Sequence, residues 1–542
     1  MLRCSFEQLG PRRLTSLHRV KKEQDLNSTF NELVTVMVMV ASTAEQQFQL
    51  MEASVNEIHC SLQSGKLTCH GLVRQYLERI KAYDQQGPTL NAMLYVNPKV
   101  LQHADAIDKE LTRGIKLKPL QCIPVVLKDN FGTADMPTTG ASLALKGMQL
   151  TKDAFTVARL RQNGALILGK TNMHELALAG LTSSSLGGQT KNPYELLRTP
   201  GGSSGGTAAA LAANFATVGT GSDTVNSIRS PASANSLVGI RPTRGLISRA
   251  GVIPVSFTQD VAGPLARTVA DAAIMLDVMA GYDPDDPVTA LGIGKIPATY
   301  SASLDRDGLK SARIGVLRTL FGSGPDHEQV NRVTANAIEV LKRQGAILKE
   351  IDDAAFDTGK LNSDLDVQKY EYKFQLNNFL KPQPNPPVHS LAELIASGKY
   401  HKASLENFLV SAESYENGLN QPDYKDRRVK IDGLRVKLAN LMAKNNVVAL
   451  LYPHQKRLPV MIGEMNQAER NGILAALSGF PAITVPAGFS TPTENAPIGV
   501  PVGIEFLGPP FSEPRLLQIA YGFEQATHAR KPPQSTPPID GH

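Results

Sequence analysis

The sequence predicts an α/β fold in which one large domain surrounds a single β-sheet. Apolar residues 123–127 form a run typical of a buried strand. Residues 314–317, a helix-forming stretch over 328–344 and residues 346–351 then follow one another as a β–α–β unit. The chain has 542 residues, of which 42% are hydrophobic, and this is enough to bury a large core around one sheet.

Further elements are expected on both sides of these segments. An amphipathic helix over 52–63 and a second helix after Thr68 are expected to pack as an N-terminal hairpin. A capping box beginning at Thr268 predicts an apolar helix that ends near Gly281. The remaining predicted elements are strands at 447–452, 482–485 and 502–507 and a closing helix near 513–526.

The chain is expected to divide into three parts. Residues 1–50 are an N-terminal extension, either a targeting segment or disordered, whose apolar run at 33–41 is too short to span a bilayer. Residues 51–530 form the main domain, and a largely helical insert around 352–445 is expected over the mouth of the site. Residues 531–542 are a Pro-rich tail that is expected to be disordered.

Charge narrows the classes of partner. The net charge is +6, from 56 basic and 50 acidic residues, and no long basic run is interleaved with aromatic residues. Nucleic acid is therefore not an expected partner, and stable membrane insertion is not expected either. The N-terminal extension does not determine the cellular compartment: the cytoplasm is favoured, and secretion or an organelle are the alternatives.

Two serines and one lysine form a candidate site. Ser203 lies in the Gly-Gly-Ser-Ser-Gly-Gly segment at 201–206, Ser227 lies in the segment 223–229, and Lys128 ends the buried strand. A serine hydroxyl is a poor nucleophile until a base removes its proton. Lysine can be that base only when it is neutral, so burial must lower its pKa by roughly three units, or about 4 kcal/mol.

The chain between the two serines can bring them together. Residues 207–214 favour a helix, and residues 215–221 favour a strand. A helix of about eight residues advances only ~12 Å, and the strand can return over a similar distance. The glycines around Ser203 allow a tight turn at the start of this helix. The spacing therefore permits contact between the two serines.

These segments resemble the amidase signature family of serine hydrolases. The resemblance extends from Val55 to Thr527 and implies the amidase signature fold, a single large domain with a central mixed β-sheet covered by helices. Further segments that match in the right order are 169–172, 188–193, 231–243, 259–264, 479–482 and 508–510.

The resemblance implies a role for each residue of the site. Ser227 is the nucleophile that accepts the acyl group, Ser203 relays the proton through a cis peptide bond, and Lys128 is the terminal base. The family needs no metal or organic cofactor for this chemistry. The residues that would support the two loops are Ser204, Asp223 and Arg229.

The loop before the nucleophile departs from the family pattern. The resemblance implies that backbone N–H groups from Thr224 to Ser227 stabilise the oxyanion, but this chain has Val225 and Asn226 where the family usually has two glycines. A β-branched residue at positive φ is a strong outlier, whereas Asn tolerates the left-handed region. We therefore expect negative φ at Val225 and any left-handed residue at Asn226.

The substrate pocket is expected along the stretch 177–182. By the resemblance, its small residues, including Ala177 and Ala179, line the acyl pocket. This stretch contains no arginine and no acid, which favours neutral, partly apolar amides.

Two other hydrolase motifs match parts of the sequence. Residues 164–171 fit the P-loop pattern, but their Ala-Leu-Ile-Leu centre indicates a buried strand rather than a phosphate-binding loop. Residues 201–205 fit a nucleophile elbow, which requires a strand directly before it. The preceding polar stretch at 191–200 contains two prolines and does not read as a strand.

Histidine and cysteine do not indicate a metal site. His174 lacks the second histidine of a zinc-binding helix, so we interpret it as a hydrogen-bonded structural or surface residue. The four cysteines form no CxxC pair. We interpret Cys60, Cys69 and Cys122 as small buried residues, with a Cys69–Cys122 bridge as the alternative.

The expected function is hydrolysis of a carboxylic amide C–N bond through an acyl-enzyme on Ser227, with ammonia or an amine released. The expected partner is a small-molecule amide, and a homodimer is an open alternative to a monomer. Two other functions remain: the amidase subunit of a transamidating complex that charges glutamyl-tRNA, and a non-catalytic binding protein with a disabled oxyanion hole.

Overall fold

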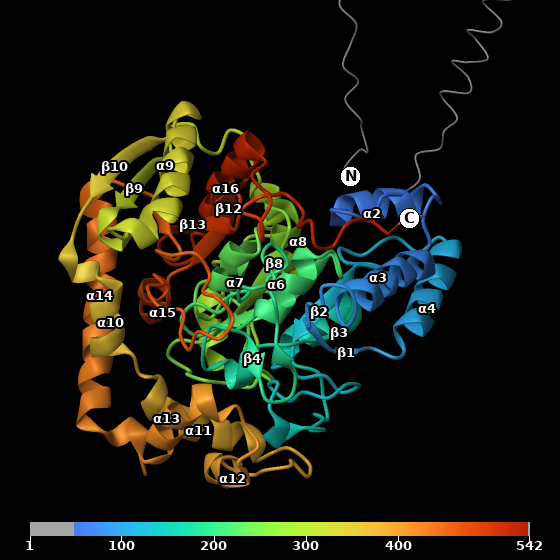
Figure 1. Cartoon of the computed structure of the whole chain (residues 1–542), viewed down its shortest axis with the longest axis horizontal. Coiled ribbons are helices and arrows are strands. Elements are labelled where there is room, and N and C mark those ends of the chain that lie inside the picture. Colours follow the sequence, from blue (N-terminus) through green and yellow to red (C-terminus); the bar gives the residue numbers. More distant parts are fainter. Residues whose placement is uncertain (1–47, 540–542) are drawn as a thin grey trace, which may run out of the picture.

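The computed structural model describes residues 48–539 and shows one large α/β domain. Its centre is an eleven-stranded sheet in the order β1-β3-β2-β6-β8-β7-β12-β13-β11-β9-β10. Helices cover the sheet, with α2 to α4 near the β1 edge and α9 near the β10 edge (Figure 1). The prediction of a single α/β domain with a central sheet is confirmed.

The strands of this sheet are β1 (Met93–Val96), β2 (Pro124–Lys128), β3 (Leu166–Thr171), β6 (Val218–Asp223), β7 (Val238–Arg241), β8 (Val261–Ala266), β9 (Arg313–Leu317), β10 (Ile347–Ile351), β11 (Ala449–Pro453), β12 (Ala482–Phe489) and β13 (Pro501–Leu507). A separate two-stranded sheet pairs β4 (Ser183–Ser184) with β5 (Gly188–Gln189).

The sheet is mixed, as the resemblance implies. Strand β2 is parallel to both β3 and β6, and β9 is parallel to both β10 and β11. The strands between these two groups pair in antiparallel fashion. The predicted β–α–β unit is β9-α9-β10, in which α9 begins at Glu328 and ends at Arg343.

The helices that flank the sheet are α2 (Val55–Gln63), α3 (Cys69–Tyr83), α4 (Val100–Thr112), α5 (Phe155–Gln162), α6 (Gly205–Ala212), α7 (Arg229–Ala234), α8 (Val269–Met279), α9 (Glu328–Arg343), α15 (Ile473–Ser478) and α16 (Glu513–Thr527). Every residue of β2, β3, β6, α6 and α7 is buried, so the elements around the candidate site form the centre of the core.

Helices also make up most of the segment between β10 and β11. They are α10 (Thr358–Leu365), α11 (Gln368–Leu380), α12 (Leu391–Ser397), α13 (Lys402–Glu413) and α14 (Pro422–Asn445). Helices α11 to α13 form a group at one end of the molecule (Figure 1, orange). Their buried leucines pack against Met173 and Leu176, close to the Ser203 loop.

A disulfide joins the start of α3 to the segment before β2. Cys69 and Cys122 are both fully buried and are bonded to each other, with their Cα atoms 5.7 Å apart. Our interpretation of these two cysteines as unpaired buried residues was wrong. The pairing depends on how α3 packs on the sheet, a long-range contact that the cysteine spacing does not reveal.

The two ends of the described chain lie together beside α2 (Figure 1). Residues 531–539 are held by hydrogen bonds: Arg79 donates to the carbonyls of Thr536 and Pro537, at 2.8 Å each, and Ser535 donates to Pro193. The expected disorder of the tail is therefore corrected for this part. The expected targeting or disordered segment falls almost wholly on residues 1–47, outside the part that the structure describes.

Candidate active site

Lys128 lies at the end of β2 and is fully buried. Its Nζ atom lies 2.7 Å from Ser203 Oγ, 2.8 Å from Ser222 Oγ and 3.2 Å from the Ser222 carbonyl oxygen. Burial lowers the pKa of Lys128 to about 7, although Asp223 and Asp260 act to raise it. A large fraction of this lysine is therefore neutral near pH 7, which a general base requires.

The Ser203 loop is shaped by glycines and lies directly before α6. The Gly202–Ser203 peptide bond is cis, as the resemblance implies, and Gly201 has φ of +71°. A Cβ atom at Gly206 would lie 2.0 Å from the Asn172 carbonyl oxygen, so only glycine allows this approach. The loop thereby holds Ser203 against the buried end of β2.

Ser227 lies beside this loop, because the Ser204 N–H donates to the Ser227 carbonyl at 3.2 Å. The contact between the two serine segments, which their spacing permits, is therefore present. No hydrogen bond joins the hydroxyls of Ser203 and Ser227, and within residues 48–539 Ser227 Oγ has no partner. Ser227 is 7% exposed whereas Ser203 is 0% exposed, so Ser227 is the serine that solvent or substrate can reach.

The backbone before Ser227 offers unused donors. The N–H groups of Thr224, Val225, Asn226 and Ser227 have no acceptor among the described residues. An oxyanion hole is usually formed by free backbone N–H groups that lie beside a nucleophile. These donors could stabilise negative charge that develops next to Ser227.

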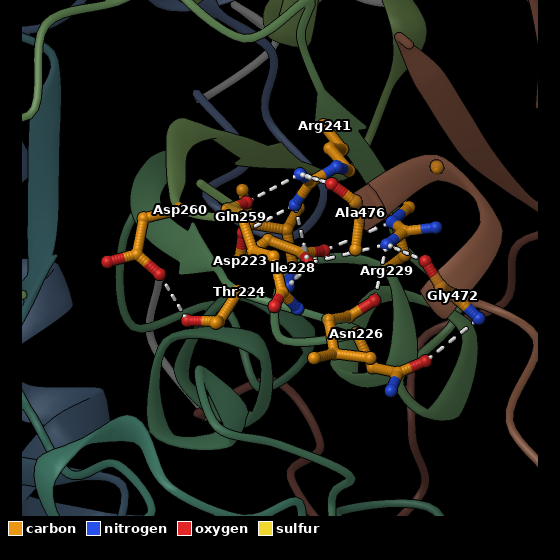
Figure 2. A network of polar contacts seen from close by, with 12 residues as sticks. Asp223, Thr224, Asn226, Ile228, Arg229, Arg241, Gln259, Asp260, Gly472 and Ala476 are labelled. Atoms are coloured by element: carbon orange, nitrogen blue, oxygen red, sulfur yellow. Dashed lines mark hydrogen bonds and ion pairs between the residues drawn. The ribbon is translucent and has the colours of Figure 1, made fainter. Parts of the chain in front are cut away.

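Neither Val225 nor Asn226 has positive φ. The expectation of negative φ at Val225 is confirmed, and Asn226 does not use the left-handed region. Instead, its side chain fixes the loop: Asn226 Oδ1 accepts a hydrogen bond from the Gly472 N–H at 3.0 Å (Figure 2). The two residues that replace glycine are thus compatible with an ordered loop.

A buried ionic network anchors the same loop (Figure 2). Asp223 lies 3.0 Å from Arg229 Nε and 3.0 Å from Arg241 Nη1, and Arg229 also lies 2.7 Å from Glu505. Burial alone would raise the pKa of Asp223, but the two guanidinium groups hold it well below its usual range. Arg229 further donates to the Val225 carbonyl at 2.6 Å, so the network holds the backbone next to the free N–H groups.

The other predicted residues have less direct positions. Ser204 donates its hydroxyl to the Ser222 carbonyl at 3.3 Å. Ala177 is buried in the same apolar cluster as the leucines of α11 to α13, and Ala179 is half-buried. Thr224 donates to Asp260 at 2.6 Å and borders a cavity of about 260 Å³, which is also lined by Gln375 and Phe379 of α11.

His174 is buried close to the Ser203 loop. Its backbone N–H donates to the Ser203 carbonyl at 3.0 Å, and its Nδ1 accepts from the Leu181 N–H at 3.3 Å. Burial lowers the pKa of His174 to about 3, so its ring is neutral. The interpretation of His174 as a hydrogen-bonded structural residue agrees with these contacts.

Three site residues escaped the sequence analysis. Ser222 binds Lys128, and Asn130 in turn donates to Ser222 Oγ at 2.9 Å, while Arg241 holds Asp223. Ser222 and Asn130 lie next to predicted residues in the chain, so adjacency was an available signal. Arg241 lies on β7, and only the strand order brings it to Asp223.

The competing motifs lack the structure that they require. Residues 166–171 of the P-loop match form the buried strand β3. No strand directly precedes Ser203 in the described chain, as a nucleophile elbow would require. Within residues 48–539, no cluster of His, Cys, Asp or Glu could hold a metal ion, and no helix is long and apolar enough to cross a membrane.

Comparison with known proteins agrees with this geometry. A family model described as Amidase matches residues 71–517. A probable amidase of Arabidopsis thaliana is 37% identical and covers 93% of this chain and 96% of its own length. A glutamyl-tRNA(Gln) amidotransferase subunit of Synechococcus sp. is 34% identical, with coverage of 90% and 94%. The structure of a peptide amidase from Stenotrophomonas maltophilia is 36% identical, has a TM-score of 0.81, and covers 89% of this chain and 99% of that one.

Proposed function

This chain belongs to the amidase family of enzymes that act on amide C–N bonds, and we propose that it hydrolyses its amide through an acyl-enzyme on Ser227. The single observation that carries the proposal is the contact of a fully buried lysine with a serine: Lys128 Nζ lies 2.7 Å from Ser203 Oγ. Burial keeps this lysine largely neutral, so it can accept a proton.

The first half-reaction forms the ester. Ser227 Oγ attacks the amide carbonyl carbon while its proton passes to Ser203 Oγ, and the Ser203 proton passes to Lys128 Nζ. The carbonyl oxygen becomes an oxyanion, which the free N–H groups of residues 224–227 stabilise. Loss of one such donor typically raises the activation free energy by about 2.7–4 kcal/mol.

Collapse of this tetrahedral intermediate to the ester completes the first half-reaction, and hydrolysis of the ester by water is the second. The proton on Lys128 returns through Ser203 to the departing nitrogen as the C–N bond breaks, and ammonia or an amine leaves. Water then attacks the ester carbonyl, its proton follows the same route, and Ser227 is regenerated as the carboxylic acid departs. Every proton transfer on the protein uses only side chains of this chain.

The relay requires one contact that the free enzyme lacks. The Ser203 and Ser227 hydroxyls are not hydrogen-bonded, and a rotation about the Cα–Cβ bond of Ser227 is the smallest change that redirects its Oγ. Catalytic hydrogen bonds often tighten only when substrate binds. We therefore assign formation of this bond to the enzyme–substrate complex.

The proposal is tested by ammonia release from a C-terminal peptide amide. Wild type is expected to release ammonia, and Ser227→Ala, Ser203→Ala and Lys128→Ala are each expected to lose at least about 10³-fold in kcat/KM. Ser363→Ala, which changes an exposed serine on α10, is the matched control. Retained activity in Ser227→Ala would contradict the assignment of the nucleophile.

A second function is favoured by one observation. The relatives named as glutamyl-tRNA(Gln) amidotransferase subunits align along most of this chain, so transamidation with a partner protein is the other candidate. Simple hydrolysis is favoured if the isolated chain releases ammonia as fast as the same chain does in a cell extract. Activity that appears only after a co-purifying partner is added back favours transamidation.

A further inference from the structure

Arg470 is a charged residue beside the candidate site. No residue in the described part of the chain pairs with its charge. It lies in the segment between β11 and α15 and is half-buried. Its guanidinium has no hydrogen-bond acceptor and no carboxylate partner among residues 48–539. Burying a guanidinium without a partner is costly, so an unpaired one needs an explanation.

The guanidinium lies against the predicted acyl pocket. A Cβ atom at Gly180 would lie 1.9 Å from Arg470 Nη1 and 2.7 Å from Arg470 Cζ, so the planar group covers the bare face of this glycine. Gly180 in turn touches Gly202, because a Cβ atom at Gly202 would lie 2.8 Å from the Gly180 carbonyl carbon. Arg470 therefore lies one glycine away from the residue that precedes Ser203.

The same segment reaches the nucleophile from the other side. Gly472, two residues after Arg470, donates its N–H to Asn226 Oδ1 at 3.0 Å, next to Ser227. The segment 470–472 thus contacts the Ser227 loop directly and reaches the Ser203 loop only through Gly180. Arg470 projects from this segment towards the stretch 177–182, where the acyl group of a substrate is expected.

The neighbouring carboxylates are already engaged. Asp223 is shared by Arg229 and Arg241, Glu505 is bound by Arg229, and Glu469 is bound by His327 and Arg457. Burial lowers the pKa of Arg470 only to about 10, so its charge persists at neutral pH. The acyl side of the site consequently carries one uncompensated positive charge.

We propose that Arg470 is a specificity-determining residue that binds a carboxylate on the acyl portion of the amide substrate. This inference rests on the proposed function and names its substrate class. It reverses the expectation of a neutral, partly apolar amide, which considered only the residues 177–182. The positive charge comes from a segment far later in the chain, and only the fold brings the two together.

The test compares matched amides. The monoamides of succinic, glutaric and adipic acid are each compared with the methyl ketone of the same length, which keeps an oxygen acceptor but has no charge. A charged hydrogen bond changes binding by about 10- to 100-fold. Wild type is expected to prefer the carboxylate over its ketone by about this factor, in kcat/KM, for at least one chain length.

Substitution of the arginine must remove this preference selectively. Arg470→Gln is expected to lose about 10- to 100-fold on the preferred carboxylate, mainly through KM, and to stay within about twofold on the ketone. Arg470→Lys is expected to recover part of the loss, and Gly180→Ala to reproduce it by displacing the guanidinium. Arg332→Gln, which changes an exposed arginine on α9, is the control.

Three results would overturn the inference. Wild type without a preference for any carboxylate contradicts it, and so does an equal loss of carboxylate and ketone turnover in Arg470→Gln. A preference for the ketones that Arg470→Gln removes would show that a neutral carbonyl is the ligand. Covalent labelling of Ser227 by a small neutral fluorophosphonate distinguishes failure of this inference from failure of the proposed function. Wild type that is labelled but shows no preference for a charged substrate contradicts only this inference. Wild type that stays unlabelled contradicts the proposed function as well.

Discussion

Lys128 is fully buried, and its pKa of about 7 is low enough for it to accept a proton. In the proposed mechanism, activity therefore depends on the deprotonation of Lys128. We predict that the rate of Ser227 labelling rises about tenfold per pH unit below pH about 7 and levels off above it. Stopped labelling at a series of pH values measures this profile. A rate that is independent of pH between about 5 and 9 would contradict the role of Lys128 as the base.

The same lysine should destabilise the fold at neutral pH. Its pKa is about 7 in the folded chain, compared with an ordinary value of 10.5. Between these values the unfolded chain binds more protons, so this residue makes the unfolding free energy rise with pH.

Lys128→Met removes that contribution. We predict that the unfolding free energy of wild type relative to Lys128→Met increases by about 1.4 kcal/mol per pH unit between pH about 7 and 10. Denaturant titrations measure it, and Ser227→Ala, which removes no titrating group, is the control. A constant difference across this window would show that Lys128 is charged in the folded state.

At the scale of elements, the loop between β6 and α7 shows how a departure from the family pattern is accommodated. Asn226 replaces a glycine and binds the Gly472 N–H. We predict that Asn226→Ala lowers the rate of Ser227 labelling by about fivefold, because the loss of one hydrogen bond of about 1 kcal/mol frees the loop. Asn445→Ala, which removes a similar amide contact on α14, should leave the rate unchanged. An unchanged rate in Asn226→Ala would contradict this role.

The disulfide fastens α3 to the chain entering β2. Cys69 and Cys122 are separated by 53 positions, so the bond closes a long loop. We predict that replacing both with alanine lowers the unfolding free energy by about 2–4 kcal/mol, measured by denaturant titration, while Ser227 labelling is retained. Equal stability of the oxidised wild type and the double variant would contradict a stabilising role.

At the scale of the whole molecule, the local parts of the fold were predictable and the long-range ones were not. The strand ending at Lys128, the β9-α9-β10 unit and the helix after Ser203 follow from hydrophobic periodicity and glycine placement. The contacts between residues from distant parts of the chain do not follow from such local patterns. Arg241 reaches Asp223 through strand order, Arg79 binds a tail residue 457 positions later in the chain, and Arg470 meets Gly180 through the packing of distant loops.

The candidate site shows the same division. Lys128, Ser203 and Ser227 could be predicted from the sequence because serine activation needs a buried base, and their roles follow from the resemblance. The structure places Lys128 against Ser203 and brings the Ser227 loop beside them, while the roles themselves stay predictions. The position of Arg470 beside Gly180, in the predicted acyl pocket, could not be predicted from the sequence, because no local pattern marks an arginine that will lack a partner.

Intact-mass spectrometry after exposure to a fluorophosphonate probe at pH about 8 tests the central claim most directly, because only an activated serine reacts. We predict that wild type gains one probe mass on Ser227, and that Ser227→Ala and Lys128→Ala do not. Lys425→Ala, which changes an exposed lysine on α14, should label like wild type. Correctly folded wild type that stays unlabelled, or Lys128→Ala that labels at the wild-type rate, would contradict a serine nucleophile activated by a buried lysine.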